Sequence, residues 1–283
     1  MPIKRVASEL GLRLHQIDTF KNWVPPDSIN LVVAVSFGLL VPARILTGAK
    51  YGGLNVHPSL LPDLRGPAPI IHTLLKRHEH TGVTLQTMHP TQFDHGAILA
   101  QTPYPGVPVS PDGNPDELSK TLGPLGAEML CRGIDSGIFV SPVGDLVEDR
   151  SQLQQLDHAP KITAEDRHIN WSIWTSDEVL LRDRVLGRLW DAETYSRCFP
   201  HKAPKRVAFQ GPWSVRHDVT ESGGVGEPIL LQAGQERGLN LGFCTADGLI
   251  VSPTSATIEG EGKGKGLNAL VNGIHAVSSS SSD

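Results

Sequence analysis

The feature that most constrains the fold is an almost unbroken apolar run from Asn30 to Phe37, rich in valine and closed by Gly38. Such a run is typical of a strand that is covered on both faces within a parallel sheet. A second apolar strand is predicted at Gly53 to Val56, and it delivers Asn55 and His57 to its C-terminal end. Open α/β sheets bind their ligands at that edge, so a site is expected there.

The surrounding pattern alternates between helices and strands. Helices are expected at 3–10, 42–49 and 69–76, and strands at 12–17, 82–88 and 97–101. A long helix is expected to begin after Asn114, which can form a capping box with Glu117. These elements predict a Rossmann-like α/β domain with a parallel sheet.

The second half of the chain has a different pattern. An irregular polar stretch is followed by one expected helix within 171–190 and by short strands at 206–215, 229–233, 238–244 and 249–253. Short strands separated by glycine and proline indicate a small β-barrel. The predicted organisation is therefore a catalytic domain over 1–145, a linker over 146–170, a β-barrel-like domain over 171–275 and a disordered tail over 276–283.

Bulk properties exclude several classes of protein. The 283 residues exceed the usual size of one core, so two domains are expected. A net charge of -5 argues against a chain coated in basic charge, although it leaves room for a local basic face. Cys131, Cys198 and Cys244 lie far apart without a C-x-x-C pair, which indicates neither disulfides nor a zinc site. No run is long and apolar enough to predict a membrane span.

Asn55 and His57 are the first candidates for chemistry. Strand side chains alternate with period two, so these two project to the same side and can address one reacting centre. An asparagine amide can donate to a developing oxyanion, and a histidine exchanges protons near neutral pH. By itself, however, an Asn-x-His pair is more often a turn-capping asparagine beside an ordinary surface histidine.

The wider sequence resembles the formyltransferases that use 10-formyltetrahydrofolate. Three segments carry the resemblance, in the order that the family has them: 54–69 (LNVHPSLLPDLRGPAP), 81–88 (TGVTLQTM) and 93–101 (FDHGAILAQ). Among the branches of this family, the chain most resembles the methionyl-tRNA formyltransferases, in particular the fungal mitochondrial kind. The segments 35–42 (VSFGLLVP), 159–163 (APKIT) and 169–171 (INW) carry this closer resemblance.

The resemblance implies a function, a site and partners. The expected reaction transfers a formyl group from 10-formyltetrahydrofolate to the α-amine of methionine on initiator tRNA, with Asn55, His57 and Asp94 as catalytic residues. The expected folate-binding residues are Ser59, Leu60, Leu61, Pro62, Gly38 and Leu39. No metal and no DNA partner are expected, and the family implies a monomer in the mitochondrial matrix. Basic residues between Arg182 and Arg206 are consistent with contacts to tRNA phosphates.

The resemblance also leaves alternatives open. Family members begin with a strand, a helix and a second strand that this sequence is expected to lack, and the opening residues do not read as a mitochondrial presequence. The alternatives are another folate-dependent formyltransferase, a hydrolase of the formyl folate, or an inactive truncated fragment that binds folate or RNA.

Overall fold

The computed structural model describes residues 2–146, 156–217, 223–232 and 239–280. The chain forms two units, one made of 1–69, 80–108 and 119–160, and the other of 70–79, 109–118 and 161–283. The predicted domain boundaries do not coincide with the edges of these units and stay a prediction. Within the predicted linker, residues 147–155 lie outside the described residues.

The first unit is built on a mixed sheet with the strand order β1-β2-β4-β5. Its strands are β1 (Val32–Val35), β2 (Gly53–His57), β4 (Thr84–Thr87) and β5 (Ile98–Gln101). β1 and β2 run parallel, as predicted, whereas β4 pairs antiparallel with both β2 and β5. The α/β class is confirmed, and the sheet contains the predicted parallel pair, which β4 and β5 extend by antiparallel pairing. The short loop between β4 and β5 permits only an antiparallel return, because a parallel neighbour needs a long crossover.

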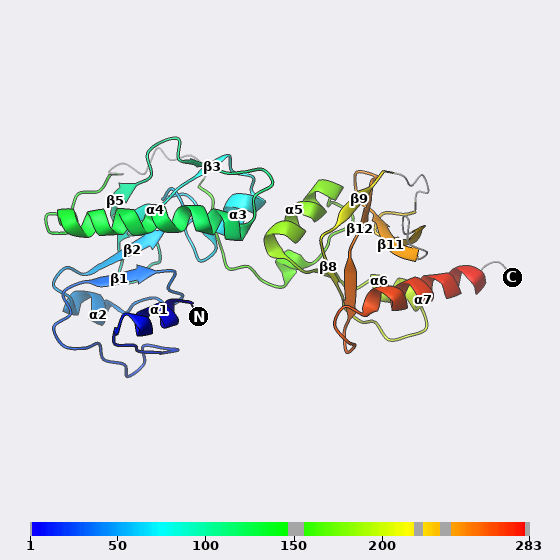
Figure 1. Cartoon of the computed structure of the whole chain (residues 1–283), viewed down its shortest axis with the longest axis horizontal. Coiled ribbons are helices and arrows are strands. Elements are labelled where there is room, and N and C mark those ends of the chain that lie inside the picture. Colours follow the sequence, from blue (N-terminus) through cyan, green and yellow to red (C-terminus); the bar gives the residue numbers. More distant parts are fainter. Residues whose placement is uncertain (1, 147–155, 218–222, 233–238, 281–283) are drawn as a thin grey trace. The chain divides into compact units, whose positions relative to one another are not determined.

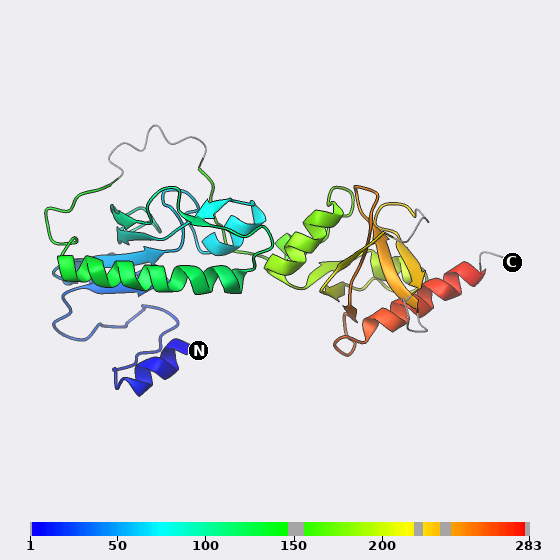
Figure 2. The ribbon, with the colours of Figure 1, turned by 45° about the horizontal axis from the view of Figure 1, so that its top comes forward.

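The helices of the first half of the chain confirm most of the predicted pattern. They are α1 (Pro2–Glu9), α2 (Ala43–Gly48), α3 (Pro69–Leu75) and α4 (Pro115–Ser136), and a short strand pair is formed by β3 (His80–Thr81) and β6 (Val107–Pro108). The predicted capping box begins α4, because Asn114 Oδ1 accepts from the Glu117 backbone N–H at 3.0 Å. Figures 1 and 2 show α4 running along the sheet, and a Cβ on Gly133 would meet the side chain of Leu85 in β4.

Two local expectations are wrong. Residues 12–17 form no strand, and Leu12 is 59% exposed, since no neighbouring strand pairs with this segment. β1 is not covered on both faces, because Val33 and Val35 are 42% and 56% exposed. β1 lies at the end of the sheet order, and an apolar run cannot distinguish such an edge strand from a central one.

The second unit contains two antiparallel sheets around a shared aromatic core. One sheet has the order β10-β11-β12-β9 and the other the order β13-β8-β7. The strands are β7 (Leu189–Asp191), β8 (Val207–Gln210), β9 (Ser214–Arg216), β10 (Pro228–Gln232), β11 (Leu239–Cys244), β12 (Ile250–Ser252) and β13 (Ser255–Ile258). The helical elements are η1 (Glu165–Arg167), α5 (Ser176–Leu186), α6 (Thr194–Cys198) and α7 (Gly266–Ser280). β7, β13, α6 and α7 were not predicted.

The C-terminal tail requires a correction. Disorder was expected over 276–283, but α7 continues to Ser280, and residues 281–283 lie outside the described residues. The reason is the apolar spacing earlier in α7, which buries Leu270 and Val271 in the core of the unit. A helix anchored in this way can extend into a serine run that has no signal of its own. No described helix is long and apolar enough to span a membrane.

A buried carboxylate organises this core. Asp191 at the end of β7 is 1% exposed, and its Oδ2 accepts from Trp171 Nε1 at 2.9 Å and from Thr194 Oγ1 at 2.6 Å. Its Oδ1 accepts from the backbone N–H groups of Glu193 and Thr194. The Trp171 ring stacks on Phe243 of β11 at 4.7 Å between centroids. Asp191 therefore links the edge of one sheet to the aromatic core.

Candidate active site

The sheet of the first unit positions Asn55 and His57 as the sequence predicted. In the register between β2 and β4, Asn55 is the Cα partner of Gln86 and His57 is the partner of Thr84. Directly opposed residues in a sheet project their side chains to the same face. Two pairs of polar side chains therefore line one face near the C-terminal end of β2.

Asp94 lies against these side chains, although the loop after β4 carries it. Its Oδ1 accepts from Asn55 Nδ2 at 3.2 Å and from Gln86 Nε2 at 3.0 Å, and its Oδ2 accepts from the Gly66 backbone N–H at 3.0 Å. Arg65 Nε donates to the Asp94 carbonyl oxygen at 2.8 Å. The structure thus brings the three predicted catalytic residues together and fixes the carboxyl from several sides.

The imidazole of His57 is buried, and the contacts of its two nitrogens limit where its proton can be. Nε2 lies 3.0 Å from the Leu64 carbonyl oxygen, which can only accept, so Nε2 carries a hydrogen. Nδ1 lies 3.4 Å from Asp94 Oδ1. Nδ1 of His57 therefore faces the carboxyl oxygen that also accepts from Asn55 and Gln86.

Unusual backbone conformations hold the two loops of the site. Leu64 and Asp94 both have φ of 56°, and Gly66 has φ of 125°. Non-glycine residues in the left-handed region cost free energy and occur often at functional sites. A Cβ on Gly66 would lie 2.4 Å from the Ala159 carbonyl oxygen, so the chain passes closely there. A residue within the predicted linker also holds this loop, because Ala159 N donates to the Arg65 carbonyl at 2.8 Å.

The segment expected to contact folate is tied to the same sheet. Ser59 Oγ donates to the Asp63 carbonyl at 2.7 Å, and the Leu61 backbone N–H donates to Thr84 Oγ1 at 3.1 Å. Leu61 and Pro62 are buried, and the side chain of half-buried Leu60 reaches the backbone at Gly82. These contacts give the segment 59–62 a defined shape beside His57.

Gly38 and Leu39, the other expected folate residues, follow β1. Val35 of β1 is the Cα partner of Val56 of β2, and the two strands run parallel. The C-terminal ends of the two strands therefore lie at the same sheet edge. Gly38 is exposed and Leu39 half-buried at that edge, so they are neighbours of the site rather than part of the Asp94 cluster.

Sequence reasoning missed the polar groups that hold Asp94. Gly66 stood within the motif that carried the resemblance, yet the role of its backbone N–H depends on a loop conformation that sequence does not reveal. Gln86 gave a usable signal, because it is a polar residue at an inward position of a predicted strand. It is 1% exposed in the structure. A buried polar side chain on a strand requires a partner, and that requirement could have pointed to it.

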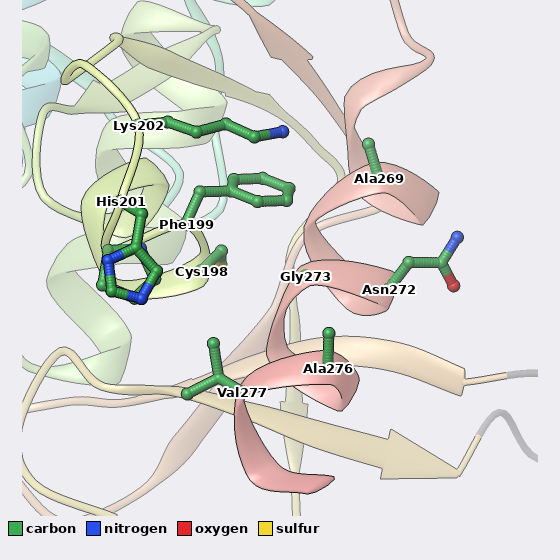
Figure 3. Close-up of a pocket in the computed structure, with 10 residues that line it drawn as sticks. Cys198, Phe199, His201, Lys202, Ala269, Asn272, Gly273, Ala276 and Val277 are labelled. Carbon is green, nitrogen blue, oxygen red and sulfur yellow. The ribbon is translucent and has the colours of Figure 1, made fainter. Parts of the chain in front are cut away.

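A cavity of about 400 Å³ lies elsewhere, between the end of α6 and α7 in the second unit. Figure 3 shows Phe199 and Lys202 directed toward α7, which carries Ala269 and Gly273, and the lysine ammonium lies 4.4 Å from the centroid of the Phe199 ring. None of the predicted site residues lines this cavity. Among the described residues, no group of three or more His, Cys, Asp or Glu side chains is arranged to hold a metal ion.

Comparison with known proteins finds similarity over much of the chain. Residues 16–134 match the family described as formyl transferase. Over these residues the chain is similar to that family. It is 35% identical over 201 residues to the mitochondrial methionyl-tRNA formyltransferase of Homo sapiens, which covers 69% of this chain and 47% of the human protein. Its identity to the mitochondrial enzyme of Saccharomyces cerevisiae is 36% over 180 residues, which covers 56% of this chain and 43% of the yeast protein.

The sequence match to these relatives covers part of the chain, and the likeness in fold to a solved structure covers more of it. The chain spans about half the length of the curated relatives that it matches, as shown by the 47% and 43% coverage. A structure of HypX from Aquifex aeolicus in complex with tetrahydrofolic acid superposes with a TM-score of 0.54 at 16% identity, over 81% of this chain and 36% of HypX. At that identity the likeness concerns the fold alone.

Proposed function

We propose that this chain transfers a formyl group from 10-formyltetrahydrofolate to the α-amine of methionine on initiator tRNA. The observation that carries the proposal is the cluster in which Asn55 and Gln86 donate to Asp94 while His57 faces the same carboxyl oxygen. The match of residues 16–134 to the formyl transferase family and the identity to mitochondrial methionyl-tRNA formyltransferases support it. By the same relationship, we propose a mitochondrial location and a monomeric enzyme.

The chemistry is an acyl transfer. The free amine attacks the formyl carbon, a tetrahedral oxyanion forms, and the bond from that carbon to the folate nitrogen then breaks. The amine loses one proton and the folate nitrogen gains one. Asn55 uses one amide hydrogen on Asp94 and keeps a second for the oxyanion, because a primary amide has two N–H donors. We assign the acid and base function to His57 and Asp94, whose Nδ1 and Oδ1 atoms lie 3.4 Å apart.

A direct contact between His57 and the oxyanion requires one rearrangement. The Nε2–H group is bonded to the Leu64 carbonyl, so it reaches substrate only if that bond is exchanged. Leu64 lies in a loop with a left-handed backbone at residues 64 and 66, which binding of the folate can displace. We propose that the formyl oxygen takes the place of the Leu64 carbonyl or that Asn55 alone donates to it.

We propose that basic side chains of the second unit contact the tRNA. Several basic residues of the 182–206 segment already have partners, since Arg182 pairs with Glu178, Arg197 with Glu193 and Lys205 with Glu261. Within the described residues, the side chains of Arg188, Lys202 and Arg206 have no acidic partner, and all three are exposed. We propose that these three side chains remain available for phosphate groups, and Arg188 and Lys202 are the two chosen for the test.

The function is tested by supplying 10-formyltetrahydrofolate with one acceptor at a time. The acceptors are methionyl-initiator tRNA, the same tRNA without methionine, a nucleotide-linked amino sugar, and water alone. Formylation of the charged tRNA only is the expected result. Transfer to the sugar, or release of formate in water at a comparable rate, would replace the proposal by one of the alternatives.

Variants of two basic residues test the contacts with tRNA separately from the formyl transfer itself. Arg188→Ala and Lys202→Ala are expected to raise the KM for charged tRNA and to weaken its dependence on salt, without changing the KM for the folate. Glu165→Ala in η1 is the control, because its exposed carboxylate contacts only His168 in the described interactions. A KM for tRNA that is unchanged in both basic variants would remove the assigned contacts but not the formyl transfer.

A further inference from the structure

We propose that Gln86 is a positioning residue that holds Asp94 for the reaction, an inference that rests on the proposed formyl transfer. Gln86 lies in β4, is 1% exposed, and donates through Nε2 to Asp94 Oδ1 at 3.0 Å. It does not face His57 directly in the register, since its Cα partner on β2 is Asn55. Its effect on the reaction must therefore pass through the carboxyl group.

The geometry explains why a second amide is useful there. Asp94 belongs to a loop and has a left-handed backbone, so its side chain has no regular element to direct it. Asn55 and Gln86 belong to paired strands, and both amides converge on the same oxygen at 3.2 and 3.0 Å. Groups that are carried by a sheet are placed more reproducibly than groups on a loop. Gln86 therefore holds Oδ1 beside His57, while Asn55 keeps its second amide hydrogen for the substrate.

The side-chain oxygen of Gln86 also supports this role. Its Oε1 is buried and has no hydrogen-bond partner among the described residues. A buried acceptor without a partner is unfavourable, and an unbranched apolar residue such as methionine would fill similar space without it. Reversing the amide would direct Oε1 at the carboxylate and is worse. The amide is thus explained by the one bond that it makes, to Asp94.

The strand beside Gln86 shows a second adaptation. The pairing of β4 with β5 shifts between Leu85 and Gln86, so that Gln86 pairs with Ile98 while Leu85 pairs with Ala100. Irregularities of this kind bend a strand locally and redirect a side chain, and they are common beside active sites. The shift occurs at the residue that contacts Asp94.

A double-mutant cycle on the full chain tests the inference. Gln86→Met should lower kcat about tenfold or more, as the loss of an outer partner commonly does, with the KM for 10-formyltetrahydrofolate within about twofold of wild type. In an Asp94→Asn background the same change should alter kcat by less than about twofold, since the group through which it acts is gone. Gln210→Met is the control, because Gln210 bonds to Ser255 and Thr257 in the second unit.

Each other outcome has a defined meaning. A wild-type kcat in folded Gln86→Met, an equal loss in both backgrounds, or a change in KM alone would overturn the inference. If Gln86→Met does not fold, Gln86→Glu keeps the length of the side chain and should lose kcat at least as strongly. If the wild-type chain consumes the formyl donor without formylating tRNA, only the proposed acceptor is refuted. The double-mutant cycle is then measured with the rate of donor consumption. A wild-type chain that consumes no donor refutes both proposals.

Discussion

Asn55 and Gln86 lie opposite each other on β2 and β4, and both side-chain amides donate to the same oxygen of Asp94. The site is therefore anchored in the sheet, although its carboxylate comes from a loop. Substitutions in the loop and substitutions in the sheet should have different effects. The strands carry the two amide donors, whereas the loop carries the carboxylate that accepts from them.

Gly66→Ala should impair the site more than it impairs the fold. The new Cβ would lie 2.4 Å from the Ala159 carbonyl oxygen at a φ of 125°, so the loop must move and the bond from Gly66 N to Asp94 must lengthen. We expect kcat to fall by about tenfold or more. The measurement is the steady-state rate of formyl transfer, together with the melting temperature.

Gly123→Ala is the matched control for that variant. Gly123 lies within α4, and a Cβ there meets no atom within 4 Å. Alanine is favoured over glycine inside a helix by about 1 kcal/mol, so this change should leave activity intact and raise stability slightly. Equal activity in Gly66→Ala and Gly123→Ala would show that the conformation of the loop does not matter for turnover.

Asp191→Ala should destabilise the second unit without touching the chemistry of the first. The carboxylate is 1% exposed and accepts from Trp171, Thr194 and the following backbone. Its removal leaves several buried donors without partners, which should lower the free energy of unfolding by about 3 kcal/mol. Urea denaturation followed by tryptophan fluorescence measures the change. Asp177→Ala, at an exposed ion pair with Arg77, should cost less than about 1 kcal/mol.

The three cysteines should differ widely in reactivity. Burial, together with the negative charge of Asp191, raises the pKa of the Cys198 thiol to about 12, and burial also raises the pKa of Cys244. Both thiols therefore stay protonated at pH 8, whereas Cys131 on α4 is exposed. Iodoacetamide at pH 8 should label Cys131 first in the native protein. Labelling of Cys198 at the same rate as Cys131 would contradict the packing around α6.

The sequence alone predicted the elements whose signals lie within a few neighbouring residues. The apolar strand at β2 and the capping box of α4 follow from spacing and end signals, and the structure confirms both. The period of the strand also placed Asn55 and His57 on one face. The resemblance, rather than any periodicity, pointed to Asp94, whose contact with them depends on a fold across the sheet.

What the sequence could not predict depends on distant partners. The exposure of Val33 and Val35 follows from the edge position of β1, which an apolar run does not encode. Gln86 acquires its role only from Asp94, and the loop conformation at Gly66 depends on the approach of Ala159. α7 was missed because its apolar positions become informative only once the core of the second unit is known.

The most direct test of the central claim is a single-turnover measurement of formyl transfer by His57→Ala, with excess enzyme, methionyl-initiator tRNA and 10-formyltetrahydrofolate. His57 Nδ1 lies 3.4 Å from Asp94 Oδ1 in the proposed site, so removal of the imidazole should slow transfer by about a hundredfold or more. The dissociation constant of tetrahydrofolate should stay within about twofold of wild type, since the segment 59–62 is held by Thr84 and by its own backbone. Transfer at the wild-type rate by this variant would contradict the assignment of the site.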